Sequence, residues 1–541
     1  MKSTMMRYPL TLGHLFDRSA TLFPGSEIVS RLPDRSLHRY TYADFHRRAG
    51  MLADALQRAG LRKGDRVATL MWNHYAHLET YFAAPLAGGV LHTLNLRLPP
   101  DEIAYIVNHA EDRFLLVDDV LLPLFEKFRG KVRPERVIGV ALSRQPLPAG
   151  IEEYEAFLSS GEGRFVPPEI DENDPCGMCY TSGTTGRPKG VVYSHRSTVL
   201  HAMTEAMTDV MALSMFDAIL PVVPMFHANS WGLPYSATLV GAKQVYPGPF
   251  LDAESLLDLM AGERVTLTAG VPTIWQAILQ ALEQQPGRWA LTPGMRMIVG
   301  GSPAPESMIR AFDRFGLRVI HAWGMTEMSP LGTISQLKPH LSSAPDDVRY
   351  AARAKQGMPV PFVEVRCVGE AGEQPWNGEA MGELHVRGPW ITGRYHNPEG
   401  GAEPFTGDGW LRTGDVVCID PEGYVKITDR TKDLIKSGGE WISSLDLENA
   451  ILSHPKVRQA AVVAIPHPKW SERPLAVIVP KEPGGLTAAE IRSHLAGTVA
   501  KWMIPDGYVF VEELPLTSTG KIFKSRLRER YRDWRWEESP R

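Results

Sequence analysis

Hydrophobic and polar residues alternate along the first part of the chain with the period of helices, and short apolar runs separate these stretches. Residues 41–59 place an apolar stripe on one helical face and are followed by Gly60, a helix stop signal. The apolar run at 67–71 predicts a strand. Further helices are expected at 77–86 and from 99–102 onward, and strands at 90–94 and 114–117, so that helix and strand alternate. This order favours βαβ units and a mostly parallel sheet.

The same alternation returns in the middle of the chain and then weakens. Helices are expected at 255–262 and 274–282, and strands at 265–269 and 297–300. Around 363–387 the helical pattern thins out while Gly, Pro and Glu become frequent. That stretch predicts a smaller β-rich lobe.

A run of polar residues at 429–433, Asp-Arg-Thr-Lys-Asp, separates this lobe from a compact C-terminal unit. The unit predicts helices and strands at 445–452, 460–465, 475–479, 488–502 and 508–511. A polar run is usually a solvated turn, but a short tether also lets a small domain reorient against a large one. The predicted fold is α/β: a large N-terminal domain of βαβ-type sheets plus a β-rich lobe (1–428), a hinge (429–434) and a small mobile α+β C-terminal domain (435–541).

Composition narrows the class of protein. A chain of 541 residues exceeds one ordinary core, and a net charge of -4 disfavours nucleic acid as the main partner. Four cysteines do not make a disulfide framework, and Cys176 and Cys179 lack a second pair at metal-binding spacing. The most apolar region, 219–242, is broken by prolines and polar residues, and the N-terminus lacks a signal-peptide pattern. We expect a cytoplasmic protein with at most peripheral membrane contact.

The stretch 180–190, Tyr-Thr-Ser-Gly-Thr-Thr-Gly-Arg-Pro-Lys-Gly, is a glycine-rich polar turn between apolar segments. Its glycines are Gly183, Gly186 and Gly190, its hydroxyl residues are Thr181, Ser182, Thr184 and Thr185, and its cation is Lys189. Backbone N–H groups, hydroxyls and a cation together suit a polyphosphate. It is not the common P-loop, because Gly190 rather than Ser or Thr follows the lysine. The alternative is an ordinary flexible surface turn.

Other stretches carry residues that suit chemistry. The segment 223–231 places His227 and Trp231 in an apolar, proline-flanked setting, where they are either packed core residues or site residues. A glycine turn at 299–303 follows an apolar strand, the place where parallel sheets bind ligands. In the segment 321–327 an aromatic side chain could stack on a base and Glu327 could hold magnesium, although a surface charge is the usual role of a glutamate.

Two polar turns nearer the C-terminus complete the set. The first, 410–415, ends on Asp415, a carboxylate that could take both hydroxyls of a ribose. The second, 515–521, ends on Lys521, although lysines near chain ends are mostly exposed and inert. Each signal is weak when it stands alone.

The order and spacing of these motifs resemble the adenylate-forming superfamily of acyl- and aryl-CoA synthetases, luciferases and adenylation domains. The resemblance covers almost the whole chain, and the turn at 180–190 with Asp415, Arg430 and Lys521 is highly specific in combination. Segments 91–95, 223–231 and 433–444 look most like bacterial medium- and long-chain fatty acyl-CoA synthetases. Amino-acid adenylation domains carry an aspartate near 223–231, and none is present here.

The resemblance implies an acid–thiol ligase. A carboxylate attacks the α-phosphorus of ATP to give an acyl-adenylate and pyrophosphate, and the thiol of coenzyme A then displaces AMP. The implied cofactors are ATP, Mg²⁺ and coenzyme A, the substrate is a fatty acid or related carboxylic acid, and close relatives form homodimers.

The resemblance also implies roles for particular residues. Thr181 and Glu327 match positions that hold magnesium, and the loop 181–189, with Ser182, Gly183, Thr184, Thr185, Gly186 and Lys189, should cradle pyrophosphate. Positions lining the nucleotide are Gly301, His321, Ala322, Trp323 and Thr326, where Trp323 replaces a more frequent tyrosine. Asp415 should bind the ribose, with Arg430 nearby, and Lys521 should reach the reacting carboxylate and α-phosphate.

The remaining implied roles concern the acyl site and the small domain. Lys432, Lys436 and Trp441 match nucleotide-contacting positions of the fatty-acid branch, and Trp231 matches the gate to an acyl tunnel. Rotation about the hinge should withdraw Lys521 from the site and bring the segment 438–441 to it. The candidate catalytic residues are therefore Lys521, Thr181, Glu327 and His227.

Two alternatives stay open. The chain could be a coenzyme A ligase for an aryl, short-chain or sulfur-containing acid, using the same site with a different pocket. It could also be a nucleotide-binding protein that has lost turnover, although intact Lys521, Glu327 and Asp415 argue against this.

Overall fold

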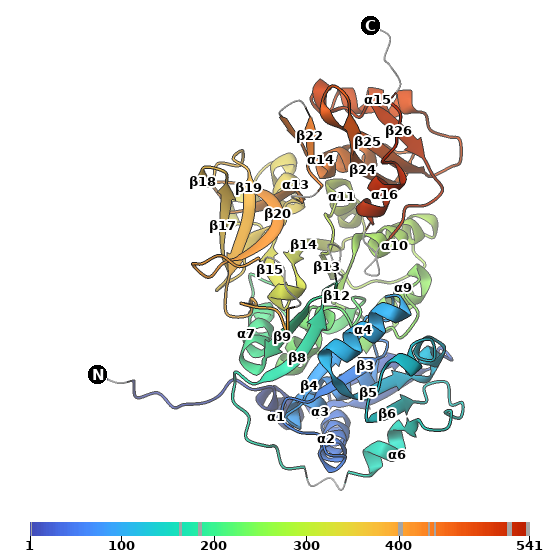
Figure 1. The fold of residues 1–541 in the computed structure, drawn as a ribbon, viewed down its shortest axis with the longest axis vertical. Helices are drawn as coiled ribbons and strands as arrows, with labels where there is room; N and C mark the ends of the chain where they lie inside the picture. Colours follow the sequence, from blue (N-terminus) through green and yellow to red (C-terminus); the bar gives the residue numbers. More distant parts are fainter. Residues whose placement is uncertain are drawn as a thin grey trace.

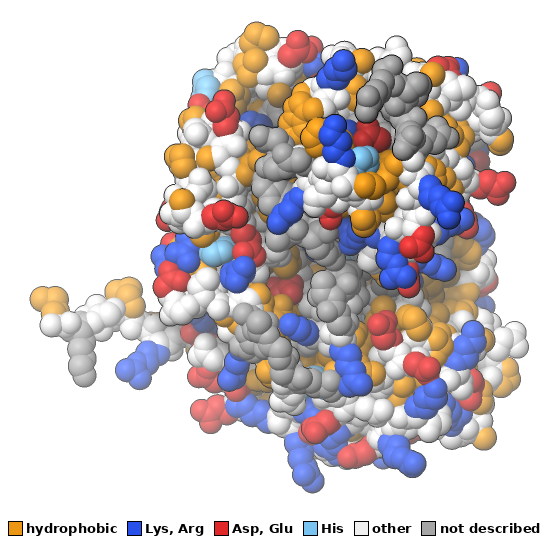
Figure 2. Space-filling model, turned by 45° about the horizontal axis from the view of Figure 1, so that its top comes forward, with side chains coloured by type: hydrophobic (Ala, Val, Ile, Leu, Met, Phe, Trp, Pro, Cys, Tyr) orange, Lys and Arg blue, Asp and Glu red, His pale blue; other side chains and the backbone are white. Residues whose placement is uncertain are grey.

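The computed structural model describes residues 1, 3–161, 165–181, 187–398, 404–430, 433–437, 440–516 and 522–536, with only the backbone of Glu440 and Trp441. Figure 1 shows a large N-terminal part, a β-rich lobe on its flank and a small C-terminal lobe at the top. The first residues project from the body, and Met1, Met5, Met6 and Tyr8 are exposed there (Figures 1 and 2). The predicted α/β class is confirmed.

In the described ranges, the first sheet has seven strands in the order β7-β6-β5-β3-β4-β8-β9. Their bounds are β3 Arg66–Leu70, β4 Val90–Thr93, β5 Asp112–Asp118, β6 Arg136–Val140, β7 Glu152–Glu153, β8 Pro175–Tyr180 and β9 Gly190–Ser194. All pairs are parallel except β8 with β9. Its connecting helices are α2 Tyr42–Arg58, α3 Tyr75–Leu86, α4 Pro100–Ala110, α5 Leu122–Phe125 and α6 Tyr154–Ser159.

Helix α2 starts where the sequence predicts, because Thr41 and Asp44 form a capping box at its N-terminus. Thr41 Oγ1 accepts the N–H of Asp44, and Asp44 accepts the N–H of Thr41. The buried stripe of α2 then packs on α3 under the first sheet. A local signal and an amphipathic pattern thus agree on the same helix.

The second sheet joins distant parts of the chain. Its strands among the described residues run in the order β16-β15-β14-β13-β12-β10-β11-β1-β2. Their bounds are β1 Glu27–Arg31, β2 Leu37–Thr41, β10 Ala218–Pro221, β11 Lys243–Tyr246, β12 Leu267–Gly270, β13 Arg296–Val299, β14 Arg318–Gly324, β15 Leu331–Ile334 and β16 Met358–Pro359. The strands from β1 to β14 in this order pair in parallel, whereas both edges are antiparallel. The predicted mostly parallel arrangement is confirmed.

Helices of the second sheet include α1 Leu12–Leu22, α7 His195–Ala206, α8 Leu233–Val240, α9 Ala253–Gly262, α10 Pro272–Gln284, α11 Glu306–Arg314, α12 Pro339–Ser342 and α13 Asp346–Ala354. The predicted β-rich lobe is an antiparallel sheet in the order β18-β17-β19-β20-β21. Its bounds are β17 Glu364–Gly369, β18 Gly372–Glu373, β19 Gly382–Arg387, β20 Leu411–Ile419 and β21 Val425–Arg430.

The small C-terminal lobe is the expected α+β unit, with one difference. Its elements are β22 Ile435–Ser437, β23 Glu440–Ile442, α14 Ser444–Leu452, β24 Val457–His467, β25 Ser471–Pro480, α15 Ala488–Ala496, β26 Gly507–Phe510 and α16 Lys524–Arg530. The helix predicted at 488–502 ends at Ala496, because Gly497 follows and Ala500 is extended (φ -61°, ψ 142°). Residues Lys501–Met503 form a separate 3-10 turn.

A buried ion pair lies among helices α2, α3 and α6. The Arg48 guanidinium donates to Glu79 at 2.7 Å, and Glu79 is fully buried. Tyr154 donates its hydroxyl to the same carboxylate at 2.5 Å, and Arg48 reaches Glu155 on α6. No helix in the described ranges is both long and apolar enough to cross a lipid bilayer.

We expect Arg48→Met to destabilise the fold, because it leaves the Glu79 carboxylate buried without its cation. Breaking a buried ion pair on one side costs about 3–5 kcal/mol, which should appear as a lower midpoint in chemical denaturation. The control is Arg129→Met, whose partner Glu126 lies on the surface; its effect should stay below about 1 kcal/mol. Equal midpoints for the two variants would contradict this role of Arg48.

Candidate active site

The glycine-rich stretch is the turn of the antiparallel hairpin β8–β9, in which Tyr180 pairs with Gly190. Two hydrogen bonds close its base: Thr181 N–H to the Lys189 carbonyl at 2.9 Å, and Lys189 N–H to Thr181 Oγ1 at 3.1 Å. The two ends of the loop are therefore held next to one another.

Tyr395 connects this loop to an acid from another segment. The Lys189 ammonium lies 4.7 Å from the centre of the Tyr395 ring, and the Tyr395 hydroxyl donates to Glu327 Oε1 at 2.8 Å. Glu327 is buried in the turn Thr326–Met328, and its carbonyl accepts the N–H of Thr392. The structure thus links Thr181, Lys189 and Glu327 through the loop base and Tyr395.

Tyr395 could not be identified from the sequence, because one tyrosine in a Gly-Arg-Tyr-His stretch carries no signal of its own. The same holds for Tyr193, whose hydroxyl donates to the Thr326 carbonyl at 2.7 Å and so fixes the turn that presents Glu327.

Asp415 is the centre of the second half of the site. Only 1% of it is exposed. Its Oδ1 accepts from Arg430 Nε at 3.0 Å, and its Oδ2 accepts from Trp323 Nε1 at 3.0 Å. The Asp415 carboxylate raises the pKa of Arg430, and Glu327 contributes to the same shift. The expected nucleotide residues Trp323, Asp415 and Arg430 therefore meet, within electrostatic reach of Glu327.

The parallel strands β13 and β14 lead into this region. Gly301 follows β13 with a φ of 80°, a backbone conformation that favours glycine. Ala322 and His321 lie on β14, and the His321 ring bonds to the Ala354 carbonyl at 3.0 Å. Burial lowers the pKa of His321 to about 4, so the ring is neutral at pH 7. The ring is buried, and β14 continues from His321 through Ala322 to Trp323.

Trp231 stands on an unusual turn. Ala228, Asn229, Ser230 and Trp231 have φ between 43° and 57°, and Gly232 follows with a φ of 82°. A left-handed conformation costs about 1–2 kcal/mol for each non-glycine residue. The Trp231 ring covers Gly300, where an added Cβ would lie 3.0 Å from the ring. The turn therefore holds Trp231 beside the expected nucleotide turn.

Side-chain hydrogen bonds fix this left-handed turn. Asn229 Oδ1 accepts from the Cys179 thiol at 3.1 Å, and Ser230 Oγ donates to the Val223 carbonyl at 2.8 Å. Asn73, in the connection between β3 and α3, donates to the carbonyls of Pro221 and Val223 at 3.0 and 2.9 Å, and accepts from Met225 N–H at 2.7 Å. Asn73 thereby joins the two large sheets under the segment that carries His227 and Trp231. The sequence around Asn73 carries no pattern that predicts this role.

The remaining predicted residues are placed as follows. His227 is half-buried and precedes the left-handed turn, and Thr326 begins the turn that carries Glu327. Lys436 is exposed on β22, and its backbone pairs with Trp441 on β23. The described residues do not include Ser182, Gly183, Thr184, Thr185, Gly186, Lys432, Lys521 or the side chain of Trp441.

The donor atoms at the site suit magnesium better than a soft metal. In the described part of the chain, no three His, Cys, Asp or Glu side chains gather as a metal site. Thr181 and Glu327 offer a hydroxyl and a carboxylate, hard oxygen ligands of the kind Mg²⁺ uses together with phosphate oxygens. Cys176 and Cys179 are buried and free, and burial raises the pKa of Cys176 to about 12.

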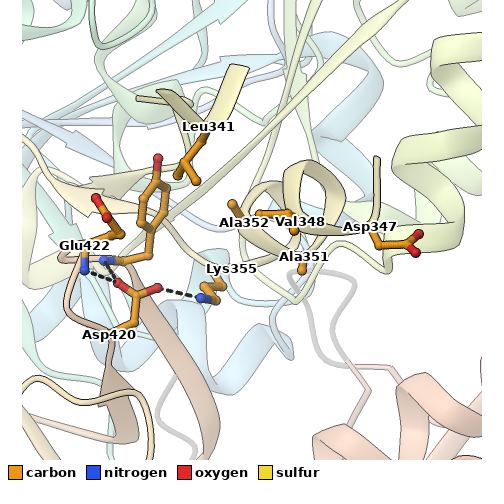
Figure 3. Close-up of a pocket in the computed structure, with 9 residues that line it drawn as sticks. Leu341, Asp347, Val348, Ala351, Ala352, Lys355, Asp420 and Glu422 are labelled. Atoms are coloured by element: carbon orange, nitrogen blue, oxygen red, sulfur yellow. Dashed lines mark hydrogen bonds and ion pairs between the residues drawn. The ribbon is translucent and has the colours of Figure 1, made fainter. Parts of the chain in front are cut away.

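A hollow on the surface lies apart from the predicted site residues. It measures about 450 Å³ and lies between α13 and the turn before β21, with Leu341, Val348 and Tyr424 on its walls. In Figure 3, Lys355 and Asp420 point at one another and form an ion pair. None of the predicted site residues lines it.

Known proteins resemble this chain over nearly its whole length. A family model described as AMP-binding enzyme matches residues 16–396, and one described as AMP-binding enzyme C-terminal domain matches 446–521. A long-chain-fatty-acid–CoA ligase of Thermus thermophilus is 52% identical over 536 residues (98% of this chain, 97% of the relative). A medium-chain-fatty-acid–CoA ligase of Ectopseudomonas oleovorans is 46% identical over 544 residues (98% of each). ATP-bound MatB from Rhodopseudomonas palustris superposes with a TM-score of 0.81 at 27% identity (97% and 99% covered).

We expect Gly232→Ala to disturb the left-handed turn more than its backbone conformation alone requires. A Cβ at Gly232 would lie 2.6 Å from His201 Nδ1 and 3.2 Å from Glu205 Oε2, both on buried side chains. The control is Gly316→Ala, which has a similar φ of 69° but open space around it. Overpacking should destabilise Gly232→Ala by about 1–3 kcal/mol more than the control, measured by thermal denaturation. Matching shifts in the two variants would disprove the crowding.

Proposed function

The chain belongs to the AMP-binding enzyme family, and from that membership we propose that it activates a medium- or long-chain fatty acid. The product is the acyl-CoA thioester, made through an acyl-adenylate with release of AMP and pyrophosphate. Relatives that are fatty-acid–CoA ligases support this substrate class. The observation that carries the proposal is the meeting of Trp323, Asp415 and Arg430 with Glu327 and the Thr181–Lys189 loop base.

In the first step, a carboxylate oxygen of the fatty acid forms a bond to the α-phosphorus of ATP, and the bond from that phosphorus to pyrophosphate breaks. Both reactants are anions, so the work lies in positioning them and in neutralising charge. Lys189 and Arg430 are cations on two sides of the region, and Lys521 is proposed to reach the reacting oxygens. Asp415 is proposed to take the ribose hydroxyls.

In the second step, the sulfur of coenzyme A forms a bond to the acyl carbonyl carbon and loses its proton, while the bond to AMP breaks. Thr181 and Glu327 are the residues that would hold Mg²⁺, which supplies charge neutralisation for phosphate oxygens when bound. Tyr395 keeps the Glu327 carboxylate oriented by the hydrogen bond at 2.8 Å. His227 lies between the loop segment and Trp231 in sequence and is proposed to contact the reacting groups.

The small lobe is proposed to serve the two steps in two orientations. Residues 429–434 act as the hinge between 1–428 and 435–541, and rotation exchanges Lys521 for the segment 438–441. Lys432, Lys436 and Trp441 are then the small-lobe contacts to the nucleotide. Trp231 is proposed to gate the acyl tunnel, supported by its position over Gly300.

We further propose that the protein works in the cytoplasm as a homodimer, with at most peripheral membrane contact. The exposed Met5, Met6 and Tyr8 on the projecting N-terminal segment support association with a second copy, because apolar groups of this kind favour burial (Figure 2). Size-exclusion chromatography with light scattering measures the assembly state.

A panel of acids tests the proposed reaction. Acetate, octanoate, palmitate, benzoate and 3-(methylthio)propionate are each supplied with ATP, Mg²⁺ and coenzyme A. We expect AMP formation with octanoate or palmitate to exceed that with acetate or benzoate by about tenfold or more, since each methylene adds binding in an apolar pocket. Formation of ADP, or no dependence on the acid, would reject the proposal. A preference for benzoate, acetate or the sulfur acid would move it to the alternative ligases.

We expect Trp231→Ala to change the chain-length profile without abolishing the reaction. Removing the ring uncovers Gly300 and opens space for the acyl chain, so the ratio of kcat/KM for palmitate and octanoate should shift by about tenfold. The control is Trp376→Ala, because Trp376 is exposed on the β-rich lobe, between β18 and β19 and beside Gly423. An unchanged profile in Trp231→Ala would return Trp231 to a packing role.

A further inference from the structure

Strand β21 ends on two charged residues that face opposite ways, as neighbours on a strand do. Arg430 turns to Asp415 in the site. Asp429 turns to the small lobe, where its Oδ2 accepts the N–H of Ser444 at 2.6 Å, and only 1% of it is exposed. Ser444 is the first residue of α14, so this carboxylate satisfies a free N–H group at the positive end of that helix.

A buried lysine of the small lobe lies next to this contact. Lys524, at the start of α16, donates to Ser444 Oγ at 2.6 Å and pairs with Glu448 Oε1 at 2.8 Å. Burial lowers the pKa of Lys524, but Glu448, Asp429 and Asp433 together hold that pKa above its ordinary value. The positive charge therefore depends on acids from both sides of the interlobe segment.

The acids differ in which lobe they belong to. Glu448 and Asp433 lie on the small-lobe side of residues 431–432, and Asp433 pairs there with Arg528 of α16. Asp429 is the first residue of the proposed hinge 429–434, but it still pairs with Val416 of β20 and so stays with the β-rich lobe. When the small lobe turns, Lys524 keeps Glu448 but leaves Asp429 behind. A buried cation that loses a nearby carboxylate is less stable, and so is an uncapped α14.

Other contacts across the boundary lack this property. Ser443 Oγ donates to the Thr428 carbonyl, Gln276 donates to the Arg458 carbonyl at 3.1 Å, and Lys426 pairs with Asp446 at 3.2 Å on the surface. The first two are neutral, and the third is screened by water because its side chains are 43% and 36% exposed. Compared with these three contacts between the lobes, the contact of Asp429 is the one that involves a buried charged side chain.

We propose that Asp429 is a positioning residue, a charged latch that stabilises the small lobe in the orientation seen in this structure. The inference rests on the proposed function, since it assigns the two half-reactions to two orientations. Asp429 touches neither substrate nor reacting atoms; it sets how often the small lobe occupies the orientation that one half-reaction needs.

The test is Asp429→Asn, which keeps the size of the side chain and an oxygen that accepts from Ser444, but removes the charge. Two rates are measured: ATP–pyrophosphate exchange with palmitate in the absence of coenzyme A, and thioester formation from supplied palmitoyl-adenylate. We expect the ratio of the two rates to differ at least fivefold from wild type. The control is Asp446→Asn, the exposed acid of the surface pair, whose ratio should stay within twofold of wild type.

A ratio within twofold of wild type in Asp429→Asn, with both rates unchanged or both lowered equally, would overturn the latch. Hydrogen exchange of the first turn of α14 gives a readout that needs no turnover, and we expect exchange at least tenfold faster in Asp429→Asn than in Asp446→Asn. Should wild type catalyse neither half-reaction, the proposed function fails while the exchange comparison still decides the latch. If Asp429→Asn does not fold, Asp429→Glu keeps the charge and is expected to retain the wild-type ratio; a fivefold change there would also overturn the latch.

Discussion

The arrangement of the site depends on one carboxylate held between two donors. Asp415 belongs to β20 of the β-rich lobe, Arg430 to β21 of the same lobe, and Trp323 to β14 of the parallel sheet. Trp323 and Asp415 are 92 residues apart in the chain, so their hydrogen bond fixes the β-rich lobe against the edge of the large sheet. Because Asp415 is almost fully buried, its charge is stable only while Arg430 and Trp323 stay in place.

A second constraint is the strained turn that carries Trp231. Consecutive left-handed residues are unfavourable for L-amino acids, and such strain persists only where surrounding contacts over-determine it. Here the contacts come from Cys179, Val223 and, one layer further out, Asn73. The two large sheets therefore act together on a single turn. A substitution where the two sheets meet, such as one at Asn73, should therefore alter the position of Trp231, although Asn73 lies far in sequence from the proposed site residues.

The sequence predicts local elements well, but it predicts poorly the contacts between segments that lie far apart in the chain. Helix α2 follows from its apolar stripe and the Thr41 capping box, and the apolar segments on both sides of the glycine-rich stretch are the paired strands β8 and β9. The helix expected at 488–502 was too long, because an apolar periodic pattern outweighed the stop signal of Gly497. Tyr395 and Asn73 could not be predicted: they act through partners 68 and 152 residues away, and neither position has a chemical signature before the chain is folded.

Because Asp429 and Arg430 are neighbours, the contacts of Asp415 in the site are linked to the orientation of the small lobe. Strand geometry sends the two side chains to opposite faces, so one residue serves the site and the next serves the small lobe. Inserting a single residue before them would move Asp429 into the place that faces Asp415 and would remove the carboxylate from the positive end of α14. The first contact would then be repulsive, and the second would be lost. The register of β21 against β20, in which Asp415 pairs with Arg430, is therefore the feature that lets nucleotide contacts and lobe orientation share one strand end.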